Sequence, residues 1–456
     1  MARAATAGLA ARIWARDASI WTGSGEDRWL GWLDEPMRAR GHVGRLTEFA
    51  AAVAADGLTE VVLLGMGGSS LAPEVLRRTV KSTTFHVLDT THPTAISTLA
   101  EALDLDHALF LVSSKSGTTL ETRCLLDFFW PRAGERGDRF VAITDPGTEL
   151  EQLARDRGFR DVFAGEPEIG GRFSALSAFG LVPAALLELD LEALLDRAVE
   201  TAESCKGDES NPGLELGLEL GAGWREGRDK VVINPNPGGF GLWAEQLFAE
   251  STGKEGRGLV PAPGEPGEGP DRQLARPSIE QPSDLGSEFF RFEFATAVAG
   301  SLMEINPFDQ PNVQEAKDRT EAILASGDQP SVEPVGSVDE LLSQARPRDY
   351  FCVQAFVAPS AETDGRIAVL RDRVRAATGM VTTAGYGPRY LHSTGQLHKG
   401  GPENGLFLQV VDDPEHLDIP GRPHGFRRLV RAQAAGDFEA LRERGRRVAR
   451  IRLEDL

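Results

Sequence analysis

The first half of the chain alternates short apolar runs with amphipathic stretches of helical length. The apolar runs, each predicted to be a strand, are residues 60–65, 84–89, 108–113, 140–144 and 160–163. Helical patterns lie between them, for example at residues 71–80, 94–103 and 121–129. Successive strand–helix units of this kind predict an α/β fold in which helices cover both faces of a parallel sheet.

The order 2-1-3-4-5 is common in doubly wound sheets and makes strands 1 and 3 neighbours. The turns after these two strands are rich in glycine and hydroxyl groups, with the sequences GMGGSS (residues 65–70) and SKSGTT (residues 114–119). Open parallel sheets bind ligands where the strand order reverses. We therefore expect the two turns to meet at a ligand site.

A second alternating region follows, with predicted strands at residues 230–234, 351–358, 379–383, 405–411 and 448–453. We predict an N-terminal helical segment (1–45) that packs on the core, a first doubly wound domain (46–208) and a second one (209–456), both with flavodoxin-like strand order. The break near residues 205–212, CKGDESNP, interrupts a helical pattern. The Pro/Gly-rich residues 261–286 are predicted to form a long surface loop.

Composition narrows the function classes. The formal charge of −20 argues against nucleic acid as a partner, because nucleic-acid binders usually carry basic patches. The sequence contains no run of about 18 apolar residues, so no membrane span is predicted. Asp17 and the nearby tryptophans interrupt the apolar core that a signal peptide would need. The 3 cysteines are too widely spaced for a disulfide framework or a zinc pattern, so we expect a cytoplasmic protein without a metal site.

The SKSGTT turn is the strongest candidate for ligand binding. It joins an apolar strand to an amphipathic helix, where free N–H groups and the positive end of the helix dipole favour an anion. Thr118 and Glu121 have the spacing of a capping box, which predicts where the helix begins. Phosphate is the expected anion.

The GMGGSS turn has two interpretations. With Asp89 at the end of the second strand, it resembles a dinucleotide fingerprint, but the third glycine of that motif is replaced by Ser70. Paired with SKSGTT, the turn favours phosphate over NAD.

Other polar motifs are ambiguous in isolation. Gly171 and Arg172 fit either a ligand contact or an ordinary turn with a surface arginine. Glu250 and Lys317 fit exposed helix faces, and a histidine such as His392 is as often structural as catalytic.

Together, GMGGSS, SKSGTTLET, IGGRFSALSAFG, QLFAESTGKEG and NPFDQPNVQEAK resemble the landmarks of the glucose-6-phosphate isomerase family across roughly residues 10–456. RIWARDASIW and LHSTGQLHKGG look most like the isomerase half of transaldolase–isomerase fusions, without the transaldolase barrel. The resemblance implies two sugar-isomerase (SIS) domains that interconvert glucose 6-phosphate and fructose 6-phosphate through an enediol(ate), with no cofactor. It also implies a phosphosugar as partner, with a homodimer or an associated transaldolase as further possibilities.

Carried over by motif, the resemblance implies a role for each matching residue. Glu250 matches the base, Arg172 the enediolate-stabilising cation and Lys317 the lysine that assists ring opening. The implied phosphate ligands are Ser69, Ser114, Lys115, Ser116 and Thr119. Further implied substrate contacts are Gly68, Gly171, Gln246 and His398.

One element departs from the family pattern. The family's ring-opening histidine lies between the glutamate and lysine motifs and comes from the neighbouring subunit, but no histidine lies between Glu250 and Lys317. We expect His392 to take this role, with His398 in reserve. Three alternatives stay open: a dual glucose/mannose-6-phosphate isomerase, a non-catalytic phosphosugar sensor and, less favoured, an NAD-dependent enzyme.

Overall fold

The structure is a computed structural model that describes residues 8–326 and 329–456. Its first half contains a five-stranded parallel sheet. The strands are β1 (Glu60–Gly65), β2 (Phe85–Leu88), β3 (Ala108–Ser113), β4 (Phe140–Thr144) and β5 (Asp161–Ala164). Their order, β2-β1-β3-β4-β5, confirms the prediction. Gly65 pairs with Ser113, so the turns after β1 and β3 start side by side.

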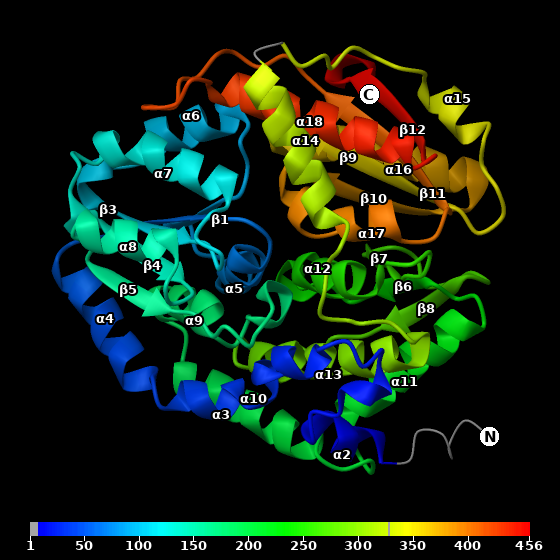
Figure 1. The fold of residues 1–456 in the computed structure, drawn as a ribbon, viewed down its shortest axis with the longest axis horizontal. Coiled ribbons are helices and arrows are strands. Elements are labelled where there is room, and N and C mark those ends of the chain that lie inside the picture. Colours follow the sequence, from blue (N-terminus) through cyan, green and yellow to red (C-terminus); the bar gives the residue numbers. More distant parts are fainter. Residues whose placement is uncertain (1–7, 327–328) are drawn as a thin grey trace.

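Helices cover both faces of this sheet (Figure 1). They are α5 (Leu71–Val80), α6 (Pro93–Ala102), α7 (Leu120–Arg132), α8 (Glu149–Asp156) and α9 (Ala178–Leu186). Along β1, Leu63 belongs to one buried cluster and Val62 and Leu64 belong to another. Successive side chains of a strand point to opposite faces, so both faces are buried and the doubly wound prediction is confirmed.

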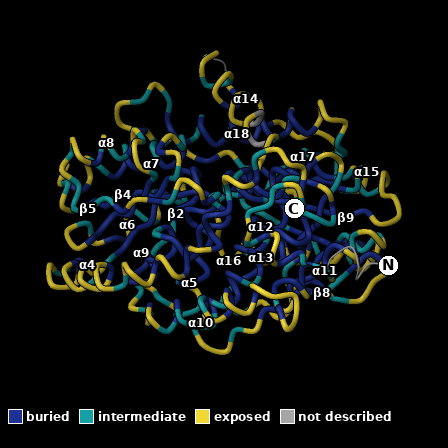
Figure 2. Tube along the Cα trace, turned by 60° about the horizontal axis from the view of Figure 1, so that its bottom comes forward, coloured by how far each residue is buried: buried dark blue, intermediate teal, exposed yellow. Residues whose placement is uncertain are grey.

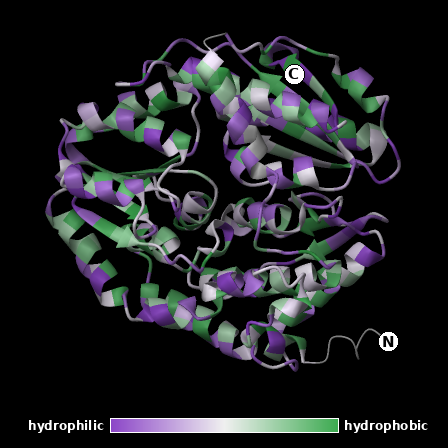
Figure 3. Ribbon diagram, in the orientation of Figure 1, coloured by the Kyte–Doolittle hydropathy of each residue, from purple (hydrophilic) through white to green (hydrophobic). Residues whose placement is uncertain are grey.

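The second half contains a four-stranded parallel sheet of order β10-β9-β11-β12. Its elements are β9 (Tyr350–Phe356), α16 (Ala361–Thr378), β10 (Val381–Tyr386), α17 (Gly395–Gly400), β11 (Gly405–Val411), α18 (Phe426–Glu443) and β12 (Arg447–Arg452). This is again the flavodoxin-like order. In Figure 3 the strands of both large sheets are mainly hydrophobic, whereas the covering helices combine hydrophobic and hydrophilic residues.

The predicted strand near residue 230 does not join this sheet. β6 (Lys230–Ile233) lies between β7 (Val260–Pro263) and β8 (Arg272–Ala275) in a separate three-stranded sheet. The prediction of a long surface loop at 261–286 was therefore wrong: this stretch contains most of β7, all of β8 and the start of α13 (Asp284–Met303). Prolines 261 and 263 fit because β7 is an edge strand, where a missing N–H is tolerated.

The remaining helices surround these sheets. They are α2 (Leu9–Trp14), α3 (Glu35–Arg40), α4 (Val43–Ala55), α10 (Leu191–Ser204), α11 (Pro212–Arg225), α12 (Gly241–Thr252), α14 (Val313–Ser326) and α15 (Val338–Leu342). Figure 1 shows α12 near the centre of the molecule, and Figure 2 shows buried backbone there with exposed segments at the rim. Within the described residues, no helix is both long and apolar enough to cross a membrane.

The N-terminal segment packs on the core from Leu9 onward, with Trp21 and Trp32 buried; residues 1–7 of the predicted segment lie outside the described residues. The predicted break at residues 205–212 coincides with the link between α10 and α11. The predicted boundary at 45/46 falls inside α4. The division into domains stays a prediction.

Candidate functional site

Two glycine turns touch at the end of β1. The short helical turn Gly67–Ser69 follows β1, and a second one, Gly171–Phe173, packs against it. A Cβ added to Gly68 would lie 2.0 Å from the carbonyl oxygen of Gly171, so only glycine permits this approach. Gly67 has φ +55°, and a Cβ there would lie 2.6 Å from the carbonyl oxygen of His392. Three segments that are distant in sequence therefore meet at this point.

The SKSGTT turn forms the neighbouring wall. Its hydroxyls pair with one another: Ser114 Oγ lies 2.9 Å from Thr119 Oγ1, and Ser116 Oγ lies 3.1 Å from Thr118 Oγ1. Helix α7 begins at Leu120, with Thr119 as an N-cap whose side chain makes no capping bond. The turn therefore presents hydroxyls at a helix N-terminus, as expected for an anion site.

The predicted capping box at Thr118 and Glu121 was wrong. Thr119, not Thr118, is the N-cap, and the Glu121 carboxylate makes no capping pair with Thr118. It lies instead 2.8 Å from His392 Nε2. A partner 271 residues away in sequence has displaced the local interaction.

Lys115 is already engaged. Its ammonium donates to Asp145 Oδ2 at 2.5 Å and to the carbonyl oxygen of Glu166 at 2.8 Å. These two bonds use two of the three N–H donors of the ammonium, so a direct role in phosphate binding stays a prediction that needs no exchange of partner.

Glu250 lies on the buried helix α12, one turn after Gln246. The Gln246 amide Nε2 donates to Glu250 Oε2 at 2.8 Å and to the carbonyl oxygen of His392 at 2.9 Å. Arg172 Nη1 lies 3.4 Å from the other carboxylate oxygen of Glu250. The structure thus brings the predicted base, the predicted cation and the histidine segment together.

The Arg172 guanidinium is fixed from several sides. Its Nε donates to Ser251 Oγ at 2.7 Å, Nη1 to Gln310 Oε1 at 2.9 Å, and Nη2 to the carbonyl oxygen of Pro307 at 2.7 Å. Burial lowers the pKa of Arg172, and the negative charge of Glu250 opposes that shift. The result is a positive charge held beside Glu250 without freedom to swing away.

Lys254, in the motif after Glu250, holds the 306–310 turn in place. Its ammonium donates to the carbonyl oxygen of Asn306 at 2.6 Å and pairs with the Asp309 carboxylate at 2.5 Å. Burial and the nearby Arg172 charge lower the pKa of Lys254 to about 8. The position of Arg172 therefore depends on Lys254 as well.

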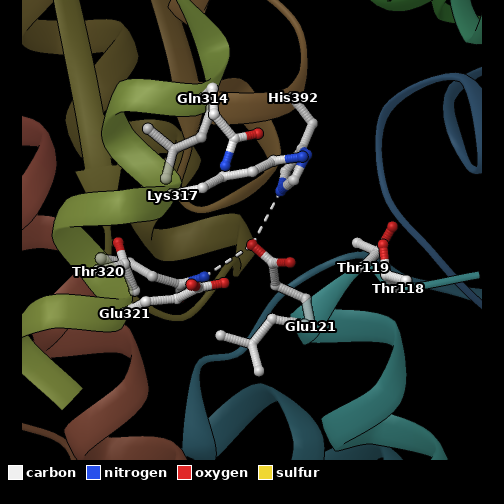
Figure 4. Close-up of a pocket in the computed structure, with 11 residues that line it drawn as sticks. Thr118, Thr119, Glu121, Gln314, Lys317, Thr320, Glu321 and His392 are labelled. Atoms are coloured by element: carbon white, nitrogen blue, oxygen red, sulfur yellow. Dashed lines mark hydrogen bonds and ion pairs between the residues drawn. The ribbon is translucent and has the colours of Figure 1, made fainter. Parts of the chain in front are cut away.

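His392 and Lys317 line one cavity of about 190 Å³ (Figure 4). Its walls come from the SKSGTT turn, α7, α14, the segment before α17 and α18; they include Thr118, Thr119, Glu121, Gln314, Lys317, His392 and Gln433. Burial raises the pKa of Glu121, but the adjacent His392, which hydrogen-bonds the carboxylate, and a further contribution from Lys317 bring it below its usual value. The turn predicted to bind an anion, a carboxylate, an imidazole and an ammonium thus share one cavity.

His398 lies elsewhere. It is buried between the rings of Tyr390 and Phe407, and its Nδ1 lies 3.1 Å from Gln354 Nε2. Burial lowers the pKa of His398 far below its usual value. The structure thus places the reserve histidine in the core of the four-stranded sheet and not in the cavity, because it follows His392 into helix α17.

Sequence reasoning missed Glu121, Gln310 and Gln433 as site residues. Glu121 lies within the motif SKSGTTLET and Gln310 within NPFDQPNVQEAK, so their position in these motifs could have identified them. Gln433 lies in α18 outside every motif, and nothing local distinguishes it.

Comparisons with known proteins point to one family. Residues 45–202 match the family model of phosphoglucose isomerase. The chain is 32% identical over 248 residues to a glucose-6-phosphate isomerase of Rubrobacter xylanophilus, covering 49% of this chain and 57% of that protein. It is 28% identical over 392 residues to one of Symbiobacterium thermophilum, covering 64% of this chain and 86% of that protein.

The coverage of relatives is uneven. A glucose-6-phosphate isomerase of Gloeothece citriformis is 34% identical, but the match covers only 45% of its length. The chain thus spans about half the length of two of these three relatives. A solved glucose-6-phosphate isomerase structure from Chlamydia trachomatis aligns with a TM-score of 0.53 at 21% identity, covering 70% of this chain and 78% of that one, which supports the fold alone.

Proposed function

We propose that this chain, whose residues 45–202 match the family model of phosphoglucose isomerase, interconverts glucose 6-phosphate and fructose 6-phosphate. The observation that carries the proposal is the bridge made by Gln246, which hydrogen-bonds both the Glu250 carboxylate and the His392 carbonyl. This bridge joins the predicted base to the segment of His392, which lines the cavity beside the SKSGTT turn. A phosphosugar whose phosphate is bound by the GMGGSS and SKSGTT turns would extend toward both Glu250 and His392.

Glu250 and Arg172 fit the isomerisation step. In the ketose-to-aldose direction, Glu250 removes a proton from C1 and an enediolate forms with its negative charge on O2. A proton then moves from the O1 hydroxyl to O2, and the proton held by Glu250 returns to C2, which leaves an aldehyde at C1 and a hydroxyl at C2. The sugar gains and loses no atoms overall. The Arg172 guanidinium, 3.4 Å from the Glu250 carboxylate, would stabilise the charge that develops on the sugar oxygens.

His392 and Lys317 fit ring opening. The imidazole is held by Glu121 at 2.8 Å, and Lys317 lines the same cavity. Ring opening moves a proton from the anomeric hydroxyl to the ring oxygen while the bond from the anomeric carbon to the ring oxygen breaks. A histidine that accepts and returns one proton can do this without net change. Because His392 reaches this cavity within one chain, a neighbouring subunit is not needed to supply the imidazole.

A coupled assay tests the proposal. Purified protein is incubated with fructose 6-phosphate, and glucose 6-phosphate is detected by a dehydrogenase that reduces NADP. We expect sustained turnover. Binding of fructose 6-phosphate without turnover would overturn the isomerase proposal in favour of a phosphosugar sensor.

The finer parts of the proposal concern specificity and setting. Mannose 6-phosphate shares the same enediol, and its conversion in the same assay would identify a dual isomerase. We also propose a cytoplasmic setting, with a homodimer or a transaldolase as partner. Sedimentation of the chain alone and with a transaldolase distinguishes these partners, and a monomer in both experiments would contradict both.

A further inference from the structure

Gln433 is an uncharged, buried side chain on α18 that lies at the His392 cavity. Its amide Nε2 donates to Glu121 Oε1 at 2.8 Å. Its carbonyl Oε1 accepts from the hydroxyl of Thr91, which follows β2, at 2.6 Å. Gln433 therefore connects the first half of the chain to the Glu121–His392 pair through two directional bonds.

The direction of these bonds constrains the proton on His392. Because the Thr91 hydroxyl donates to the Gln433 carbonyl, the Gln433 amide faces Glu121 as a donor. In the reverse orientation, two oxygens without protons would face each other across 2.8 Å. The same oxygen, Glu121 Oε1, lies 2.8 Å from His392 Nε2. An ionised carboxylate only accepts, so His392 Nε2 must carry a proton.

We propose that Gln433, oriented by Thr91, is a positioning residue that keeps Glu121 an acceptor and fixes the Nε2-protonated form of His392. This inference rests on the proposed function, since it assigns the remaining ring nitrogen, Nδ1, to proton exchange with the sugar. Among the described residues, Nδ1 of His392 makes no hydrogen bond. It is therefore the free nitrogen that can take the anomeric hydroxyl proton and return it to the ring oxygen.

The charged surroundings of Glu121 agree with this role. His392 faces it from the segment before α17, and Lys317 and Glu321 line the same cavity from α14. The Glu121 carboxylate thus lies among an imidazole, an ammonium and a second carboxylate. Gln433 adds direction without adding charge, which a charged residue at the same place would not do.

The first test reads the imidazole directly. The protein is labelled with ¹⁵N-histidine, and the His392 signal is assigned with His392→Gln. In the wild type we expect the ¹⁵N shifts of a neutral imidazole protonated at Nε2, and in Gln433→Leu we expect a mixture of the two tautomers. A wild-type signal protonated at Nδ1, or an unchanged tautomer in the variant, would overturn the proposal. This readout does not require activity, so it stands even if the proposed function fails.

The second test separates ring opening from isomerisation. Fructose 6-phosphate is compared with 5-deoxyfructose 6-phosphate, which lacks the oxygen that closes the ring, and exchange at C1 is followed by NMR in D₂O. For Gln433→Leu we expect about a tenfold loss with the closed sugar and less than about a twofold loss with the open one. Equal losses with both sugars would contradict the positioning role.

Two further variants control for structure. Thr91→Val replaces the hydroxyl with a methyl group of similar size, and we expect it to reproduce the direction of both effects even if Gln433→Leu fails to fold. Gln409→Leu is the matched control, because the buried Gln409 also binds α18, at the carbonyl oxygen of Ala434, but not Glu121. We expect Gln409→Leu to lower stability and to leave the tautomer and the ratio of the two rates unchanged. If Gln409→Leu changed the tautomer as Gln433→Leu does, the effect would be structural and the proposal wrong.

Discussion

The five-stranded sheet and the four-stranded sheet arrange their first four strands alike, as β2-β1-β3-β4 and β10-β9-β11-β12. In the first sheet, the turns after β1 and β3 are GMGGSS and SKSGTT. In the second sheet, the corresponding residues are VAPS (357–360) and DDP (412–414), each with a proline and without glycine. The backbone plan is shared, but the groups at the ends of the strands differ.

The polar groups of the second pair of turns are used inside the protein. Ser360 caps α16, Asp412 lies 3.0 Å from His92, and Asp413 binds Arg427 and Arg431. The second sheet instead contributes to the cavity through His392 and through Gln433 on α18. In the proposed function, the same fold would bind phosphate in one half and support proton transfer in the other, so the fold alone does not assign the role.

The largest expected effect comes from a residue on neither sheet. Glu250→Gln keeps the shape of the α12 side chain but removes the base, and we expect a loss in kcat of roughly 10²- to 10⁴-fold. Because the hydroxyl turns remain, phosphosugar binding measured by calorimetry should stay close to wild type. A near-native rate would mean that another group is the base.

Ser114→Ala tests the anion-binding half of the comparison. Its Oγ lies at the SKSGTT turn, 2.9 Å from Thr119 Oγ1. Hydrogen bonds to charged groups contribute about 1.5–3 kcal/mol, so we expect KM to rise about 10- to 100-fold with a smaller change in kcat. Steady-state kinetics with fructose 6-phosphate measures this. An unchanged KM would remove Ser114 from the phosphate site.

Gly68→Ala tests whether the close contact between the glycine turns matters. The added Cβ would lie 2.0 Å from the Gly171 carbonyl oxygen, so backbone must shift, at a cost of about 1–3 kcal/mol in unfolding free energy. Gly171→Ala is the matched control for stability, because its Cβ would meet nothing within 4 Å. Urea unfolding should separate the two variants. Equal stabilities would show that the turns tolerate separation.

Much of this division could be predicted from sequence. The five-stranded sheet followed from apolar runs and turn residues, which are local signals, and its order was confirmed. β7 and β8 were missed because the surrounding residues 261–286 are rich in proline and glycine, and only pairing with β6 makes these two short segments strands. Edge pairing of this kind is not visible in a local pattern.

The site shows the same limit. Arg172, Glu250 and His392 were named from motifs, and the structure brings them together. Glu121 was assigned to helix capping because Thr118 lies three residues before it, whereas its partners are His392 and Gln433. No local rule identifies a glutamine 312 residues away, so the orientation of the imidazole required the structure.

The smallest expected effect concerns Ser360, in the second sheet. Ser360 occupies the turn after β9, where Ser69 and Ser70 lie in the turn after β1. Its Oγ accepts from the backbone N–H of Thr363 at 3.1 Å and caps α16. Ser360→Ala should therefore lower the unfolding free energy by about 1 kcal/mol, as loss of an N-cap does, and leave KM and kcat unchanged. Urea unfolding and the coupled assay on the same preparation measure both quantities. A rise in KM comparable with that of Ser114→Ala would mean that the second sheet also binds the phosphosugar, and the division of roles between the two sheets would then be wrong.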